Sequence, residues 1–193
     1  MALTPSTMLA LGTKAPDFTM VDVVSGQSIS LATFAGKKAL LVMFICRHCP
    51  FVKHIQTQLA QLGQDYSDKN VGIVAISAND VTTHPEDSPE QLKAMAQELG
   101  FNFPYCYDQT QEVAKQYTAA CTPDFFLFDQ HQTLVYRGQL DDSRPQNGVP
   151  VTGKDIRAAL DAVLADGSVS PEQRPSIGCN IKWKRGNEPF YYR

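Results

Sequence analysis

Two stretches of this chain are continuously apolar and are bounded by polar segments. They are residues 39–45 (ALLVMFI) and residues 71–77 (VGIVAIS), and both contain several β-branched or aromatic side chains. A short, unbroken apolar run of this kind is typical of a strand that is buried on both faces of a parallel sheet. The pattern therefore predicts two central strands.

Helical spacing of apolar residues follows the first of these runs and recurs later in the chain. It predicts an amphipathic helix over about residues 50–66. Ser88 is a suitable N-cap and Gly100 a suitable stop for a second helix over residues 89–99. Two shorter helices are predicted over residues 109–117 and 155–164.

The remaining apolar segments are short and predict the outer strands. Pro123 opens one strand, over residues 123–129, which forms an antiparallel hairpin with residues 133–137. Shorter strands are expected over residues 19–24, 28–31 and 103–107. The resulting order of strands and helices predicts an α/β fold with a central mixed sheet flanked by helices on both faces.

The domain organisation follows from the length and from a change of character near the C-terminus. At 193 residues the chain fits one domain, which we assign to residues 1–167. Residues 168–193 are rich in proline but also carry aromatic side chains, which disordered tails seldom do. We expect them to form a C-terminal extension that packs on the same domain.

The composition and net charge of the chain indicate which classes of binding partner to expect. The net charge of -3 and the isoelectric point near 5.8 give no reason to expect a nucleic acid or an anionic membrane as a partner. No run of 18 apolar residues is present, and the first 12 residues do not form a secretory signal. We therefore expect a cytoplasmic location, where most cysteines stay reduced.

Chemistry is concentrated in one pair of cysteines, out of five in the chain. Cys46 and Cys49 form a Cys-x-x-Cys motif between the first central strand and the helix that follows it. A helix N-terminus stabilises a thiolate, and Arg47 and His48 add to this effect when they are charged. We expect Cys46 to attack a substrate disulfide and Cys49 to resolve the mixed disulfide, with no cofactor beyond their own disulfide.

Outside the cysteine pair, one further segment indicates a functional site. The polar loop over residues 79–89 follows the second central strand, and such loops often border functional sites.

A zinc or copper site at the cysteine pair is an alternative to redox chemistry. It is disfavoured because structural zinc usually takes four ligands, and only His54 follows at short range.

Five segments, in the same order, resemble the thioredoxin superfamily, and within it the peroxiredoxin-like, TlpA-like (AhpC/TSA-redoxin) branch with a Cys-x-x-Cys motif. They are residues 12–18 (GTKAPDF), 31–37 (LATFAGK), 46–50 (CRHCP), 122–128 (TPDFFLF) and 136–138 (YRG). The resemblance implies a thioredoxin fold with an N-terminal strand extension. It also implies that Pro123 is a cis-proline facing the cysteine pair and that Thr122 and Pro123 bind substrate. Cys121, two residues before Pro123, becomes a candidate third redox thiol.

The sequence also departs from relatives in this superfamily. Arg47 and His48 replace the Gly-Pro of thioredoxin, and the histidine resembles that of disulfide isomerases and oxidases, which implies a more oxidising disulfide. Leu40 occupies the position of thioredoxin's buried carboxylate. The peroxidatic pattern Pro-x-x-x-Thr/Ser-x-x-Cys also fails, because Val42 and Cys46 occupy its first two places if Cys49 is the peroxidatic cysteine.

The sequence therefore predicts a thiol–disulfide oxidoreductase of the thioredoxin-like type, with a redox role in the cell. Its expected partners are a protein or small-molecule disulfide and a thiol electron donor, and the chain is expected to be a monomer or a weak dimer. The alternatives are a thiol peroxidase with antioxidant activity, a non-catalytic binding or adaptor module, and a metal binder.

Overall fold

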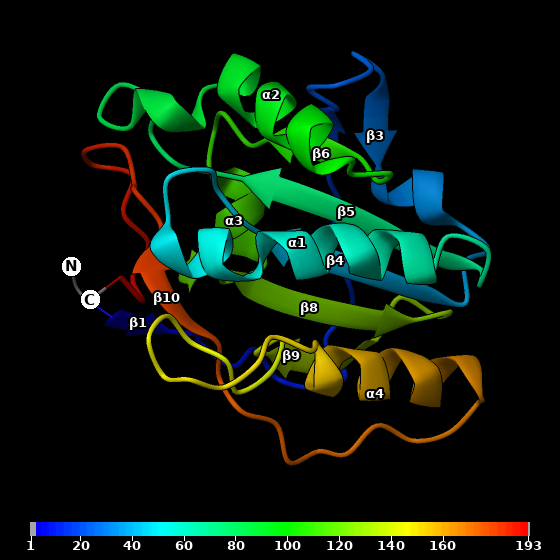
Figure 1. The fold of residues 1–193 in the computed structure, drawn as a ribbon. Coiled ribbons are helices and arrows are strands. Elements are labelled where there is room, and N and C mark those ends of the chain that lie inside the picture. The colour runs from blue at the N-terminus through cyan, green and yellow to red at the C-terminus, as the bar shows by residue number, and fades with distance from the viewer. Residues whose placement is uncertain (1–2, 193) are drawn as a thin grey trace.

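A central sheet of five strands forms the middle layer of the computed structural model, which describes residues 3–192 (Figure 1). Its strand order is β6-β5-β4-β8-β9. The neighbours β4, β5 and β6 are parallel, whereas β8 runs antiparallel to both β4 and β9. The mixed sheet is thus confirmed, with strands at Ala39–Phe44 (β4), Val71–Ser77 (β5), Tyr105–Tyr107 (β6), Asp124–Asp129 (β8) and Leu134–Gly138 (β9).

Within the described part of the chain, four α-helices pack around this sheet, with α1 in front of β4 and β5 and α3 behind the sheet (Figure 1). Their bounds are Pro50–Asp65 (α1), Pro89–Leu99 (α2), Glu112–Gln116 (α3) and Lys154–Leu164 (α4), and short 3-10 helices cover Leu31–Phe34 (η1) and Pro85–Asp87 (η2). Helix α2 has the expected caps, because Ser88 accepts a hydrogen bond from the Gln91 N–H and Gly100 is left-handed.

Strand β4 divides the interior into two cores because successive side chains of a strand point to opposite faces. Leu41 and Met43 pack in the core that α1, α2 and α4 cover. Leu40, Val42 and Phe44 pack in the other core, against α3 and the N-terminal segment. All six residues of β4 are buried, which explains why the run has no polar position.

Two smaller sheets complete the fold. Strands β2 (Thr19–Val21) and β3 (Ser28–Ser30) form the expected N-terminal pair. The other sheet has the order β1-β10-β7, in which β10 (Ile177–Asn180) lies between β1 (Leu3–Pro5) and β7 (Cys121–Thr122). The C-terminal segment therefore packs on the rest of the chain by pairing with two strands.

The hairpin predicted from Pro123 differs in one respect. Residues 121–122 belong to the β1-β10-β7 sheet, and β8 of the central sheet begins only at Asp124. Pro123 lies between the two strands, and its bond to Thr122 is cis, as the family resemblance implied. Within residues 3–192, no helix combines the length and apolarity needed to cross a membrane.

Candidate active site at the Cys46–Cys49 pair

Cys46 and Cys49 lie in the bend that joins β4 to α1, and both are 0% exposed. Pro50 is the first residue of α1, so Cys49 is its N-cap and Cys46 precedes the helix. The Cys49 side chain makes no capping hydrogen bond, but the backbone N–H of Val52, in the first turn, contributes to lowering the pKa of Cys49. The helix N-terminus therefore favours the Cys49 thiolate, whereas the sequence had suggested that Cys46 would gain most.

Thr122 contacts the sulfur atoms of both Cys46 and Cys49. Its hydroxyl lies 3.3 Å from Cys46 Sγ, and its carbonyl oxygen lies 3.2 Å from Cys49 Sγ. The predicted substrate-binding residues Thr122 and Pro123 are thus beside the cysteine pair. Thr122 is the last residue of β7 and Pro123 joins β7 to β8, and both are far from Cys46 in the chain.

Asp87 is the acidic residue of the site, and it is 0% exposed. Its Oδ1 accepts hydrogen bonds from the backbone N–H groups of Arg47 (2.8 Å) and His48 (3.1 Å). Its Oδ2 lies 2.5 Å from His48 Nδ1 and accepts from the Asn79 amide at 2.8 Å. Burial works against ionisation of Asp87, but these hydrogen bonds together lower its pKa.

The sequence did not identify Asp87 as a site residue, although a signal was present. The polar loop after β5 was expected to border a site, and it supplies both Asp87 and Asn79. Which of its acidic residues turns inward depends on η2, whose single turn buries Asp87 and leaves Glu86 exposed.

Arg47 and His48 have different positions relative to Cys46. His48 Nδ1 lies 3.7 Å from Cys46 Sγ, so this predicted modulating residue does contact the thiol. The guanidinium of Arg47 instead donates to the Gln91 carbonyl (2.8 Å) and lies 3.5 Å from Glu98, both on α2. Arg47 therefore binds α2 through its side chain and the site through its backbone N–H.

The pKa values of the two thiols move in opposite directions. Burial raises the pKa of Cys46, and the Cys49 thiol and the negative charge of Asp87 raise it further. Hydrogen bonds from the Cys179 and Cys46 thiols lower the pKa of Cys49 in spite of burial. In this closed, reduced arrangement the negative charge therefore lies most favourably on Cys49, contrary to the expectation of an activated Cys46 thiolate.

Cys179 is the third sulfur of the site, and the sequence left its role open. It lies on β10, directly opposite Thr122 in the strand pairing, and its sulfur is 2.8 Å from Cys49 Sγ. Cys121, which had been the candidate third thiol, is also buried, but its Sγ lies 3.6 Å from the Pro123 carbonyl oxygen. Burial raises the pKa of Cys121, so it remains protonated.

A second buried carboxylate lies just after the cis-proline. Asp124 is 0% exposed, accepts a hydrogen bond from the Ser6 hydroxyl at 2.7 Å, and faces Phe44 across the β4–β8 pair. Burial raises the pKa of Asp124 to about 7. The absence of a carboxylate at Leu40 therefore does not leave the site without buried acids.

The donor set also offers one grouping with metal-ligand chemistry. Ligand atoms of Cys46, His48 and Asp87 all lie within 4.8 Å of one another. A sulfur, an imidazole nitrogen and a carboxylate suit zinc or a similar ion, with a fourth position left open. His54 is not part of this group, because its Nε2 lies 2.7 Å from the Ser143 hydroxyl.

The layered sheet and the dithiol facing a cis-proline define a thioredoxin fold. A solved thioredoxin domain of a thiol-disulfide oxidoreductase from Bacteroides vulgatus shares it, with a TM-score of 0.63 and 23% identity over 81% of this chain and 99% of that one. The model of the AhpC/TSA family matches residues 11–137, and the chain belongs to this family. The predicted family and fold are therefore confirmed.

Two other solved structures are much more similar to this chain than the Bacteroides vulgatus domain is. An uncharacterised conserved protein from Geobacillus kaustophilus is 56% identical, with a TM-score of 0.93, and the match covers 95% of this chain and 97% of that one. A hypothetical protein from Sinorhizobium meliloti 1021 is 50% identical, also with a TM-score of 0.93, covering 95% and 100%.

Curated relatives are more distant. A Mycobacterium tuberculosis protein named as a peroxiredoxin is 27% identical over 58% of this chain, and the match spans 65% of that protein's length. The thiol-disulfide oxidoreductase ResA of Geobacillus kaustophilus is 27% identical over 66% of this chain and 68% of its own length.

Proposed function

We propose that this protein is a thiol–disulfide oxidoreductase whose redox centre is the pair Cys46 and Cys49. The observation that carries the proposal is the convergence of both sulfurs on Thr122, within 3.3 Å of its hydroxyl and 3.2 Å of its carbonyl oxygen. Two thiols held together in this way are placed to exchange between a dithiol and a disulfide. ResA, a curated relative, carries the name of this activity.

In the proposed reaction Cys46 attacks one sulfur of the substrate disulfide and releases the first substrate thiol. Cys49 then attacks the Cys46 sulfur of the mixed disulfide, releases the second substrate thiol and leaves a Cys46–Cys49 disulfide. The substrate is reduced by two electrons and the protein is oxidised by two. We assign the first attack to Cys46 because it adjoins His48, whose side chain is 17% exposed, whereas the Thr122 carbonyl and Cys179 enclose Cys49.

Deprotonation of Cys46 is the step for which His48 and Asp87 are placed. The short contact between His48 Nδ1 and Asp87 Oδ2 contains one proton, and this pair carries a net charge of about −1 when Asp87 is ionised. Transfer of the Cys46 proton to Nδ1, with the proton already there passing to Oδ2, makes the pair neutral. The charge that raises the pKa of Cys46 is thereby removed as the thiolate forms, and the Thr122 hydroxyl donates to the sulfur.

The proposal includes the conditions in which the protein acts. We place it in the cytoplasm, without a bound cofactor or metal, and as a monomer or weak dimer. Its partners are a protein or small-molecule disulfide and a thiol electron donor, with no part for a nucleic acid or a membrane.

Trapping tests the proposal. The Cys49→Ser variant should accumulate mixed disulfides on Cys46 when it is exposed to a model disulfide peptide, and mass spectrometry should locate the linkage at Cys46. Cys46→Ser is the matched control and should retain no peptide. If Cys49→Ser traps no more peptide than this control, the assignment of Cys46 is wrong. An adaptor would bind its partner equally well with Cys46→Ser.

Thiol peroxidase activity is the second candidate, favoured by membership of the AhpC/TSA family. Arg137, in the family-matched segment YRG, donates to the Leu9 carbonyl (2.8 Å) and to the side chain of Gln173 (2.7 Å), so its guanidinium is already engaged by the protein. We therefore expect the wild type to consume hydrogen peroxide no faster than Cys46→Ser. A faster, Cys46-dependent rate would establish the peroxidase instead.

A further inference from the structure

We infer that Cys179 is a third redox thiol, which takes over the disulfide from Cys46 by exchange at Cys49. This inference rests on the proposed function, because it starts from a Cys46–Cys49 disulfide. It extends the redox centre from the family-matched segment, residues 11–137, to the C-terminal strand β10.

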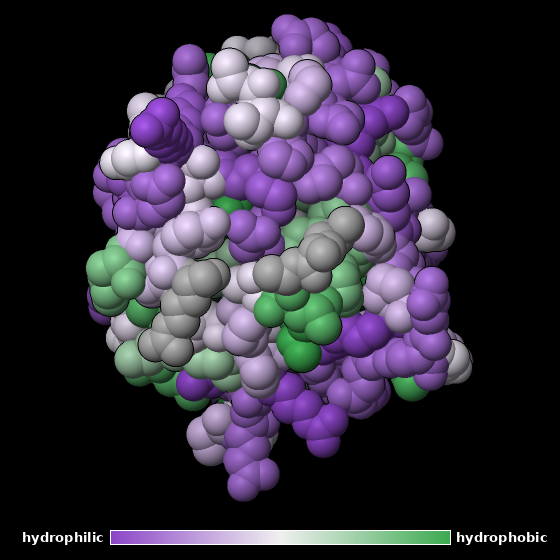
Figure 2. Space-filling model, turned by 90° about the vertical axis from the view of Figure 1, so that its left-hand side faces the viewer, coloured by the Kyte–Doolittle hydropathy of each residue, from purple (hydrophilic) through white to green (hydrophobic). Residues whose placement is uncertain are grey.

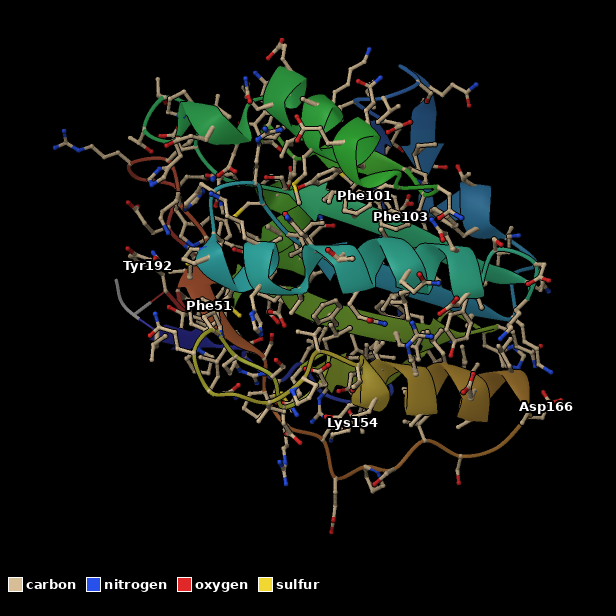
Figure 3. The ribbon with its side chains drawn as sticks, in the orientation of Figure 1. Phe51, Phe101, Phe103, Lys154, Asp166 and Tyr192 are labelled. Carbon is tan, nitrogen blue, oxygen red and sulfur yellow. The ribbon has the colours of Figure 1, made fainter. Side chains whose placement is uncertain are left out.

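The position of Cys179 is set by strand pairing. β10 pairs antiparallel with β7, with Cys179 opposite Thr122, and pairs with β1 on its other side. The preceding residue, Gly178, allows a close approach, since a Cβ there would lie 2.0 Å from the Thr122 carbonyl oxygen. The amino end of α1 lies beside β10, as Phe51 shows in Figure 3. Three elements thus hold Cys179 against the dithiol.

The contact between the sulfurs is already close to a bonding arrangement. Cys49 Sγ and Cys179 Sγ are 2.8 Å apart, and a disulfide requires about 2.05 Å. Cys46 also interacts with Cys49, so Cys49 has two sulfur neighbours. Cys121 has the carbonyl oxygen of Pro123 as its contact at 3.6 Å. Proximity thus selects Cys179 rather than Cys121.

The exchange balances without an outside reagent. The Cys179 sulfur attacks Cys49, the Cys49–Cys179 bond forms and the Cys46–Cys49 bond breaks, and Cys46 leaves as a thiolate. The proton lost by Cys179 passes to solvent, and the Cys46 thiolate takes up one proton from solvent through the His48–Asp87 pair, whose own protonation is unchanged. No electrons enter or leave, and the product is a protein with a reduced Cys46 and an oxidised C-terminal strand.

Such an exchange would give the oxidised protein two forms. In one, Cys46 is blocked by Cys49, and in the other Cys46 is again a thiol while β10 is covalently tied to the start of α1. The second form stores the disulfide in the interior, since Cys49 and Cys179 are both buried. The face of the molecule around β1, β10 and the amino end of α1 is shown in Figure 2, where a group of hydrophobic residues lies near the centre of the view.

The Cys46→Ser variant isolates this second disulfide. It retains four of the five cysteines, and glutathione disulfide should lower its free-thiol titre from four to two. Peptide mapping should find the linkage between Cys49 and Cys179. The further changes Cys46→Ser/Cys179→Ala should keep all three remaining thiols, whereas Cys46→Ser/Cys121→Ala should still form the disulfide. Tryptophan fluorescence and far-UV circular dichroism of each variant check that it is folded.

Two results would overturn the inference. One is a folded Cys46→Ser variant whose free-thiol titre stays at four under conditions that fully oxidise the wild type. The other is a linkage that maps to Cys121. Failure of the proposed function is recognised separately, because Cys179→Ala should still form the Cys46–Cys49 disulfide. If Cys179→Ala forms none, the dithiol itself is not redox-active.

Discussion

The two cysteines of the motif lie in unlike surroundings although only two residues separate them. On the Cys46 side are His48 and the ionised Asp87, and burial together with negative charge raises the pKa of Cys46. On the Cys49 side are the Cys179 thiol and the first turn of α1, which lower the pKa of Cys49. The difference teaches that the motif alone does not determine where the thiolate forms.

The same lesson applies to Asp87 and Asp124, two of the buried carboxylates. Asp87 accepts four hydrogen bonds from Arg47, His48 and Asn79, and its pKa falls below the usual range. Asp124 is equally buried but accepts fewer, chiefly from Ser6, and its pKa rises to about 7. The number of donors, and not burial by itself, decides the sign of the shift.

The largest expected effect follows from removing Cys179. Cys179→Ala deletes a hydrogen-bond donor to the Cys49 thiolate, so the pKa of Cys49 should rise and the reduced form should lose stability. The Cys46–Cys49 pair should become more reducing by at least tenfold in its equilibrium constant, or about 30 mV. Equilibration with glutathione buffers measures this. Cys121→Ala is the matched buried control. If the reduction potential is the same in both variants, the proposed difference between the surroundings of Cys46 and Cys49 is wrong.

The next effect concerns the charge beside Cys46. Asp87→Asn should lower the pKa of Cys46, because it removes a negative charge, by on the order of one unit. Thiolate absorbance against pH, measured in a Cys49→Ser background, tests this shift. Glu86→Gln changes the exposed neighbour in η2 and should leave the Cys46 titration unchanged. A Cys46 pKa that stays the same or rises in Asp87→Asn would contradict the proposed electrostatics.

Stability against pH should distinguish the two carboxylates. The pKa of Asp124 is higher in the folded than in the unfolded state, so its ionisation opposes folding increasingly as pH rises from about 4 to 7. Asp124→Asn should therefore gain stability relative to the wild type over that interval, by a few kcal/mol at most. The pKa of Asp87 is lowered, so its contribution is present at neutral pH and is lost in acid. Urea unfolding at pH 5 and pH 8 measures the Asp124 effect, and urea unfolding at about pH 3 and pH 5 measures the Asp87 effect.

The smallest effect, on both stability and the Cys46 titration, is expected when Arg47 is replaced. Its ion pair with Glu98 spans 3.5 Å and the Glu98 side chain is 62% exposed, so Arg47→Ala should cost less than about 1 kcal/mol. The Cys46 titration should not change, since the guanidinium lies on α2. A raised Cys46 pKa in Arg47→Ala would show that this side chain reaches the thiol in solution and would restore the role that the sequence suggested.

Much of the fold could be predicted from local pattern. The unbroken apolar run of β4, the spacing of α1 and the caps of α2 each act over a few residues, and the structure has all three elements. The position of β7 was not predictable, because its two residues pair with β10 from the far end of the chain. Asp87 was likewise missed, since its burial depends on one turn of η2 and on the packing of His48 against it.

The sequence by itself determined that a buried strand delivers a pair of cysteines to the start of a helix, and that a proline-led segment belongs opposite them. Those features are encoded by spacing and by residue type, which act locally. Only the tertiary structure decided that hydrogen-bond donors surround the Cys49 thiol and that a carboxylate lies near the Cys46 thiol. Asp87 and Cys179 are 38 and 130 residues from Cys49, and their effect on the pair exists only where the folded chain brings them within a few ångströms.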